Sequence, residues 1–505
     1  MPAMAADNPV TTGVTRYIDM IPRLLSCGRG GILRLLALVA LALPAAPPPA
    51  ADEGIRLPDM GTSADRVMSP REEAALGADV YRQLRRSGAL LEDLLVESYL
   101  QELGSRIAAH SGTPEQRFHF FLVRNEAINA FAVPGGYIGI NAGLMVATDE
   151  ESELASVLAH EIAHVTQRHI ARRMEAMRGM NWATAAAVVA AILASGGNPE
   201  VAQAALSSGM AASVDQTINF TLRNELEADR VGIGMLAEAG FDPRAMATFF
   251  EEIERQSRFY ESAYGEFIRT HPVNSARVSE ALSRAQRLAA PTRTDDTRYH
   301  LMQARVRALV VAQPDDAIRY FQAARRNATG MRAEAADYGL AVAQARIGQT
   351  APAQAIAARY ADATRPAAPW LLLLAQTQAR QGALDAALAT LARAERTAPE
   401  HPAITLLRAE YQLQAGEPAA ARQTLLAERF AGSAASTRLR LLAQAADETG
   451  QDGAAHYYLA EHYLQEDRPQ DAALQLRLAL ADGDLSELER ARATLRLEEL
   501  ERRAD

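Results

Sequence analysis

The 505-residue chain has no lysine, so all 52 of its basic residues are arginine. They are outnumbered by 62 acidic residues, which leaves a formal net charge of −10 and argues against nucleic acid as a partner. Cysteine occurs once, as Cys27, so the chain can form no internal disulfide and needs none in an oxidising compartment. A chain of this length is long enough for about two to four domains with packed cores.

A long hydrophobic run is also missing. The apolar stretch ILRLLALVALALPAA at 32–46 is too short to cross a membrane comfortably. Arg23, Arg29 and Arg34 precede or open it, and small residues follow, which together predict a secretory signal peptide. Residues 1–51 are therefore predicted to be a signal peptide and spacer, with an N-terminal membrane anchor as the alternative.

Hydrophobic patterns in the first half of the chain predict both helices and short strands. Two helices are expected first, within 56–86 and over 94–110. The aromatic and apolar stretch at 118–125 predicts a strand, and 129–148 predicts two short strands around a Pro-Gly-Gly turn. Helices together with a small sheet predict the α+β class for this part of the chain.

Longer helices are predicted next. Thr148 and Glu151 fit a capping box, which predicts a helix from Thr148 to about Gly179. The alanine-rich stretch 181–213 predicts either a buried helical hairpin or a mobile apolar lid. A further helix is expected over 216–239.

The second half of the chain repeats with a period of 34 residues. Glycine recurs at Gly348, Gly382, Gly416 and Gly450. Alanine recurs in the same register, at Ala341, Ala375, Ala409 and Ala443 and at Ala353, Ala387, Ala421 and Ala455. Alanine lets paired helices approach closely and glycine permits the turn between them, so the pattern resembles the tetratricopeptide repeat, with a generic alanine-rich bundle as the alternative. We predict a first domain over 52–295 and an all-α repeat solenoid over 296–505.

The segment LAHEIAHVTQRHI at 158–170 carries two histidines four residues apart on a predicted helix. Residues i and i+4 lie on one helix face, so His160 and His164 can direct nitrogens at one metal ion. Glu161 lies beside them, close enough to take a proton from an attacking water. Alone, this short pattern also fits a solvated helix face. His169 lies off that face, and we expect it to be an exposed helix histidine.

The segment NELEADRVG at 224–232 supplies two more candidate groups, Glu225 and Asp229, at i and i+4 of the later helix. Glu225 can supply a third, oxygen ligand, with a surface helix carboxylate as the alternative. Asp229 can accept a hydrogen bond from a ligand histidine and so fix its orientation. Two histidines, one glutamate and an open position form a catalytic zinc set, so we predict one Zn²⁺ per subunit.

HExxH followed by ExxxD resembles the gluzincin metallopeptidases, and most of the chain is similar to the periplasmic beta-barrel assembly-enhancing protease family. The resemblance rests on LPDMGTSA (57–64), NAFAVPGGYIGINAGL (129–144), HEIAH (160–164), NELEADRVG (224–232), THPVNSAR (270–277) and the repeats. It implies a zincin-type, mostly helical metallopeptidase domain with a small sheet, followed by the repeats. It also implies a periplasmic location.

The resemblance further implies roles for single residues. Glu161 is expected to be the general base of zinc-assisted peptide hydrolysis, with Asp229 supporting the catalytic set. Asn129 and Ala130 match a pair on an edge strand that holds the substrate backbone in gluzincins. The alternative for Asn129 is that it caps a turn.

His271 lies in RTHPVNSAR at 269–277, and the proline that follows it predicts a loop or turn, which Arg277 could anchor. Three roles stay open for His271. It is structural, or it stabilises the oxyanion of the tetrahedral intermediate, or it occupies the open zinc position and restrains the enzyme. The resemblance favours the third role.

Two classes of function fit these observations. The first is a periplasmic zinc endopeptidase with a chaperone role, which acts on misassembled outer-membrane barrel proteins and unfolded proteins while its repeats dock to the assembly machinery. The second is a repeat-based chaperone or adaptor with a latent or vestigial metal site. Glu161 favours the first, because a purely structural site needs no general base. A membrane-embedded protease would need spanning segments that the sequence does not show.

Overall fold

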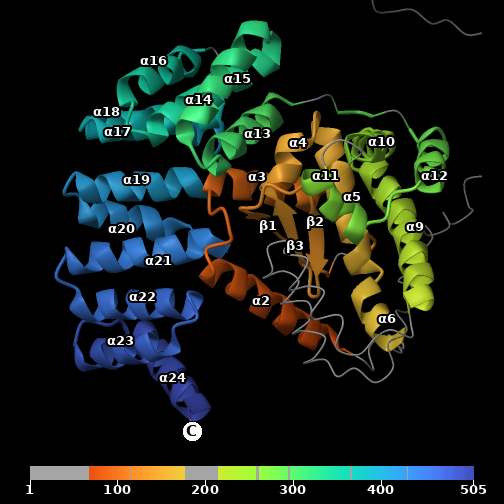
Figure 1. Ribbon diagram of the computed structural model, residues 1–505. Helices are drawn as coiled ribbons and strands as arrows, with labels where there is room; N and C mark the ends of the chain where they lie inside the picture. Colours follow the sequence, from red (N-terminus) through yellow and green to blue (C-terminus); the bar gives the residue numbers. More distant parts are fainter. Residues whose placement is uncertain are drawn as a thin grey trace, which may run out of the picture. The chain divides into compact units, whose positions relative to one another are not determined.

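The computed structural model describes residues 68–113, 115–176, 214–257, 261–289, 291–293, 296–363, 367–428, 430 and 432–504. The predicted signal peptide (1–51) and the alanine-rich stretch 181–213 lie outside these residues. The described residues belong to one compact unit, drawn in Figure 1. None of their helices is long and apolar enough to cross a membrane.

Helices dominate the fold, and the small sheet lies in the first half of the chain (Figure 1). The elements there are α2 (Pro70–Arg86), α3 (Leu94–Ala108), β1 (His119–Val123), β2 (Ala130–Val133), β3 (Tyr137–Asn141), α4 (Ala142–Ala147), α5 (Glu151–Thr166), α6 (His169–Ala176), α9 (Val214–Glu238), α10 (Ala245–Ser257), α11 (Glu261–Thr270) and α12 (Ser275–Ala285). The predicted α+β class is therefore confirmed, as are the three strands.

The three strands form a mixed sheet in the order β1-β3-β2, in which β1 runs parallel and β2 antiparallel to β3. The turn of the β2–β3 hairpin contains Gly135 and Gly136, with φ values of 82° and 87°. Glycine adopts this left-handed conformation readily, and a Cβ on Gly136 would lie only 2.0 Å from the carbonyl oxygen of Arg117. The hairpin puts β2 at an edge of the sheet and against α5, so Asn129 and Ala130 lie at that edge.

The predicted start of the motif helix is wrong. Thr148 is the C-cap of the preceding helix α4, and its buried hydroxyl donates to the carbonyl of Leu144. α5 begins at Glu151, and its N-cap, Glu150, makes no side-chain hydrogen bond. The capping box does not form because the hydroxyl of Thr148 donates to α4 and accepts from the hydroxyl of Tyr299, so it takes no part in capping α5.

The predicted end of that helix, near Gly179, is also wrong. α5 ends at Thr166, and α6 begins at His169. Arg168 between them has a φ of 52°, a left-handed conformation that interrupts the helix. The interruption lies just after the HExxH motif.

The second half consists of helices that pack on one another in chain order. They are α13 (Thr297–Val310), α14 (Pro314–Asn327), α15 (Gly330–Arg346), α16 (Thr350–Ala361), α17 (Ala368–Arg380), α18 (Leu384–Thr397), α19 (Pro402–Gln414), α20 (Pro418–Ala427), α21 (Gly432–Asp447), α22 (Asp452–Gln465), α23 (Pro469–Ala481) and α24 (Glu487–Ala504). The predicted all-α repeat fold is confirmed, and Figure 1 shows these helices stacked in pairs.

The periodic glycines and alanines explain why the helices pair. Each of the four glycines lies between two paired helices, with φ between 68° and 80°, which a residue with a Cβ adopts poorly. All of the periodic alanines are buried except Ala455, which is partly buried. The missing side-chain bulk lets the helix axes approach, as the 34-residue pattern predicted.

α3 joins the two halves of the described chain. One hydrophobic core includes residues from Leu91 to Tyr411. Asp93, the N-cap of α3, binds the guanidinium of Arg305 on α13 through two contacts of 2.8 Å. One turn further along α3, Glu97 accepts a hydrogen bond from the hydroxyl of Ser433 on α21.

Candidate metal centre

The packing of α5 on α9 brings the two sequence motifs together. His160, Glu161 and His164 lie on α5, and Glu225 lies on α9. The helices approach closely at Gly232, where a Cβ would lie 3.2 Å from backbone atoms of the α5 residue Ala159. A side chain at this position would press on the α5 backbone, so the glycine favours the close packing of α9 on α5.

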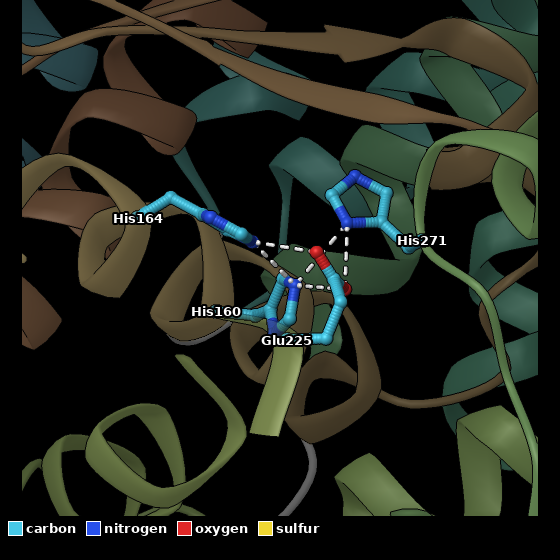
Figure 2. Close-up of side chains that lie close together, drawn as sticks. All are labelled: His160, His164, Glu225 and His271. Atoms are coloured by element: carbon cyan, nitrogen blue, oxygen red, sulfur yellow. Dashed lines mark hydrogen bonds and ion pairs between the residues drawn. The ribbon is translucent and has the colours of Figure 1, made fainter. Parts of the chain in front are cut away.

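Four side chains form one group that could hold a metal ion: His160, His164, Glu225 and His271. The Nε2 atoms of His160 and His164 are 3.0 Å apart. The Glu225 carboxylate lies 3.3 Å from the Nε2 of His160 and 3.4 Å from that of His164. Figure 2 shows the carboxylate surrounded by the three imidazole rings.

A second layer of charges supports this group. Nδ1 of His160 lies 3.0 Å from Oδ1 of Asp229. Arg277, whose side chain is fully buried, donates to both oxygens of Asp229 at 2.7 Å. It also contacts Glu225 at 3.1 Å and donates to the carbonyl of Pro272 at 2.7 Å. Arg277 thus links the α9 carboxylates to the loop that carries His271.

Burial and pairing have opposite effects on the pKa values of these groups. Burial favours the neutral form of Glu225, but His271 and hydrogen bonds from the histidines hold its pKa well below the usual range. Burial opposes a charge on His160, but Asp229 and Glu225 raise its pKa to about 10. Burial likewise opposes ionisation of Asp229, and Arg277 lowers its pKa. Two ionised carboxylates therefore lie beside the imidazoles, which is the charge that a bound cation requires.

Glu161 is 1% exposed, and its Oε1 has no hydrogen-bond partner among the described residues. The nearest candidate is Nε2 of His271, at 3.4 Å. Buried carboxylate oxygens in proteins are normally paired, so this atom is available to a group other than the described residues. Its position beside the histidine cluster suits a water or a substrate proton.

His271 lies in a bend directly after α11, as the proline that follows it predicted. Its Nδ1 is 3.3 Å from Nε2 of His160 and 3.2 Å from Glu225. The end of α11 is tied to the edge of the sheet: Asn129 donates to Glu266 at 3.0 Å, and Thr270 donates to Asn129 at 3.2 Å. The Asn129 side chain is therefore engaged by α11, a contact that the sequence did not predict.

The prediction for His169 is wrong, because this residue is only 3% exposed. Its Nδ1 lies 2.9 Å from Nδ1 of His164, and its Nε2 lies 3.3 Å from Glu227. Burial lowers the pKa of His169 to about 4. A continuous helix would have directed this side chain elsewhere, and no sequence signal marked the break at Arg168.

Residues 95–285 match Peptidase family M48. The beta-barrel assembly-enhancing protease of Yersinia pestis is 35% identical to this chain, over 88% of the chain and 92% of its own length. The protein of the same name from Escherichia coli (strain K12) is 33% identical, over 92% of this chain and 95% of its own length. The chain belongs to the beta-barrel assembly-enhancing protease family.

Members of the beta-barrel assembly-enhancing protease family are M48 metallopeptidases, so the chain is a metal-dependent protease, and the buried histidine and glutamate group is its candidate metal site. A solved structure of a thermophilic tetratricopeptide-repeat protein from Thermus thermophilus also matches, with 22% identity over 40% of this chain and 100% of that chain. Its TM-score of 0.24 is too low for a comparison of the folds.

Proposed function

We propose that the protein is a periplasmic zinc endopeptidase that acts on misassembled outer-membrane barrel proteins. The observation that carries the proposal is the burial of Glu161, whose Oε1 makes no hydrogen bond with the described residues, beside three histidines and a glutamate whose ligand atoms lie within 4.8 Å of one another. The assignment of substrates follows the names of the relatives from Yersinia pestis and Escherichia coli. The periplasmic assignment follows the predicted signal peptide and the origin of these relatives.

The ligand separations fit zinc. A tetrahedral zinc ion about 2.0–2.2 Å from each nitrogen or oxygen ligand holds those ligands roughly 3.4 Å apart. The Nε2 atoms of His160 and His164 are 3.0 Å apart, and Glu225 places Oε2 3.3 Å from the first and Oε1 3.4 Å from the second. Two imidazoles and one carboxylate also form the ligand set of several catalytic zinc sites. We therefore assign His160, His164 and Glu225 as the ligands of one zinc ion per subunit.

When bound, zinc supplies Lewis-acid chemistry that polarises a scissile carbonyl and makes water more acidic. The side chains of the protein do the remaining work. Glu161 takes the proton of the attacking water and returns it to the leaving amine. Asp229, held by two bonds from Arg277, keeps the ring of His160 in the orientation that directs Nε2 toward the cluster.

Asn129 and Ala130 are proposed to align the substrate. They lie where the edge strand β2 passes α5, so an extended peptide could add to the sheet beside the motif residues. The Asn129 side chain is bonded to Glu266 and Thr270 at the end of α11. Binding of a substrate strand at Asn129 would therefore compete with the contacts that hold α11 in place.

His271 is proposed to restrain the enzyme by occupying the fourth ligand position. Its Nδ1 lies among the ligand atoms, which favours this role over a purely structural one or an oxyanion donor. His271→Ala should then hydrolyse casein faster than wild type, because the position opens to water and substrate. The rate is measured per folded, zinc-bound molecule. A rate far below wild type would instead assign His271 to the transition state.

The two predicted domains are proposed to divide the work. Residues 52–295 carry the chemistry, and the repeats over 296–505 dock outer-membrane barrel proteins, unfolded clients and the assembly machinery. Stacked helical repeats present extended surfaces that suit such partners. A chaperone or adaptor with a latent metal site remains the second candidate. It is favoured by the placement of His271 against the cluster, which would hold the site inactive.

The test of the proposed function is metal-dependent proteolysis by the purified full chain. Casein is the substrate, with zinc removed by a chelator and then restored. Hydrolysis should be lost on zinc removal and recovered on its return. Hydrolysis that persists in protein without bound metal would reject the zinc mechanism. Zinc binding without any hydrolysis, in wild type and in His271→Ala alike, would favour the chaperone.

A further inference from the structure

The break after the HExxH motif is held in place from outside the helix. Arg168 has a φ of 52°, which is unfavourable for a residue with a Cβ. Its guanidinium donates to the carbonyl of Met68 at 2.8 Å and to Glu73 of α2 at 3.0 and 3.2 Å. These contacts stabilise a backbone conformation that the local sequence does not favour.

The consequence of the break is the position of His169. In a continuous helix, side chains five residues apart point about 140° away from each other. In this chain the ring of His169 instead lies 4.9 Å from the ring of His164, centroid to centroid, with the two Nδ1 atoms 2.9 Å apart. His169 in turn reaches Glu227 on α9, and Glu227 binds Arg172 at 3.0 Å.

The direction of these hydrogen bonds is set by the chemistry of the proposed metal site. His164 can ligate a metal through Nε2 only if its ring proton is on Nδ1. Nδ1–H then donates to Nδ1 of His169, whose own proton is on Nε2 and is donated to the Glu227 carboxylate. The three groups form one chain in which every donor has an acceptor and Nε2 of His164 keeps its lone pair.

We propose that His169, oriented by Glu227, is a positioning residue that fixes the tautomer and ring orientation of His164 for metal binding. The inference rests on the proposed zinc site. Each ligand histidine then has its own support: His160 lies directly against the Asp229 carboxylate, whereas His164 reaches a carboxylate through a second imidazole. Loss of such a support typically weakens metal binding about 10- to 100-fold.

The experiment compares zinc affinities of full-length variants, measured by competition with a chromophoric chelator. His169→Phe removes the acceptor and keeps the ring volume, and should bind zinc about 10- to 100-fold more weakly than wild type. His169→Asn places an amide oxygen near the position of Nδ1 and should recover most of the affinity. Glu227→Ala should weaken binding less than His169→Phe.

Two controls separate positioning from general damage. Glu280→Ala removes another carboxylate that binds an arginine, at 2.7 Å from Arg230, and should leave zinc affinity unchanged. Urea unfolding of each metal-free variant reports fold stability independently of zinc.

The inference is overturned if His169→Phe binds zinc as tightly as wild type, or if His169→Asn is as weak as His169→Phe. It is also overturned if the loss of affinity only follows the loss of stability in the metal-free proteins. A wild-type protein that binds no zinc would reject the proposed function itself. Wild-type binding together with an unchanged His169→Phe would reject this inference alone.

Discussion

At the scale of single residues, the candidate metal cluster depends on groups that are buried and charged at the same time. Glu225 and Asp229 are 2% and 4% exposed, and Arg277 is 1% exposed. A buried charge is stable only when it is paired, so removal of one member leaves the others uncompensated. The lowered pKa values of both carboxylates report this pairing.

The ligand and its supporting residue should therefore respond differently to substitution. Glu225→Ala removes a proposed direct ligand and should weaken zinc binding more than Asp229→Asn does. Asp229→Asn keeps an acceptor near His160 and should weaken binding by about 10- to 100-fold. Chelator competition measures both dissociation constants. Wild-type affinity in Glu225→Ala would show that the third ligand lies elsewhere.

The sequence predicted the residues of this cluster where a local rule applies. His160 and His164 follow from helical spacing, as do Glu225 and Asp229. His169 was missed because its position depends on the left-handed Arg168, which contacts α2 almost a hundred residues earlier in the chain. The engagement of Asn129 by α11 was missed for the same reason, since it joins residues far apart in sequence.

At the scale of the elements, the space around a helical glycine decides what a side chain at that position would do to the packing of the helix. Gly104 lies in α3, where a Cβ would be 2.2 Å from the ring of Phe120 on β1. Gly234 lies in α9, where a Cβ would meet nothing within 4 Å. The same substitution at these two positions therefore has opposite consequences.

Gly104→Ala should lower the free energy of unfolding by about 1–3 kcal/mol, because the ring of Phe120 must move within a packed core. Gly234→Ala should raise it by up to about 1 kcal/mol, because alanine favours the helix and finds open space. Urea unfolding of both variants beside wild type measures the two signs. A stabilised Gly104→Ala protein would contradict the packing of α3 on β1.

Periodicity predicted the strands and most helices, but it did not predict where the motif helix begins and ends. Thr148 and Glu151 have the spacing of a capping box, yet Thr148 belongs to α4. Helix α4 is only six residues long, too short for a periodic pattern to reveal. Local sequence therefore identified the elements better than their boundaries.

At the scale of the whole described unit, polar side chains join α3 to the repeat helices. Glu97 is one of them, and it shares its surroundings with Glu92, Asp93 and Arg85. Burial raises the pKa of Glu97 to about 7, with the Ser433 hydroxyl acting against that shift. The folded protein therefore binds the Glu97 proton more tightly than the unfolded chain does.

The contribution of Glu97 to the free energy of unfolding should fall as the pH rises from about 4.5 to 7. In that range the folded protein must release a proton that it binds more tightly than the unfolded chain does. The full effect is about 3 kcal/mol at most and is reduced by partial solvent exposure. Glu97→Gln should remove this fall, whereas Glu102→Gln on the same helix should keep it. Urea unfolding of the three proteins at pH 5 and pH 8 makes the comparison, and an identical pH dependence in wild type and Glu97→Gln would contradict the assignment.

The 34-residue period predicted the repeats because each helix pair repeats the same local packing. It could not predict that α3 contacts α13 and α21, since the Ser433 to Glu97 contact joins residues 336 positions apart. That arrangement depends on the tertiary structure and leaves no pattern in either segment.

The most direct test of the central claim is a comparison of Glu161→Gln with wild type, in which zinc content and casein hydrolysis are measured on the same samples. The proposed ligands His160, His164 and Glu225 remain in the variant, so its zinc content should equal that of wild type. Without the proposed general base, hydrolysis should fall by a factor of about 10² to 10⁴. A fully zinc-loaded Glu161→Gln protein that cleaves casein at the wild-type rate would contradict the proposed mechanism.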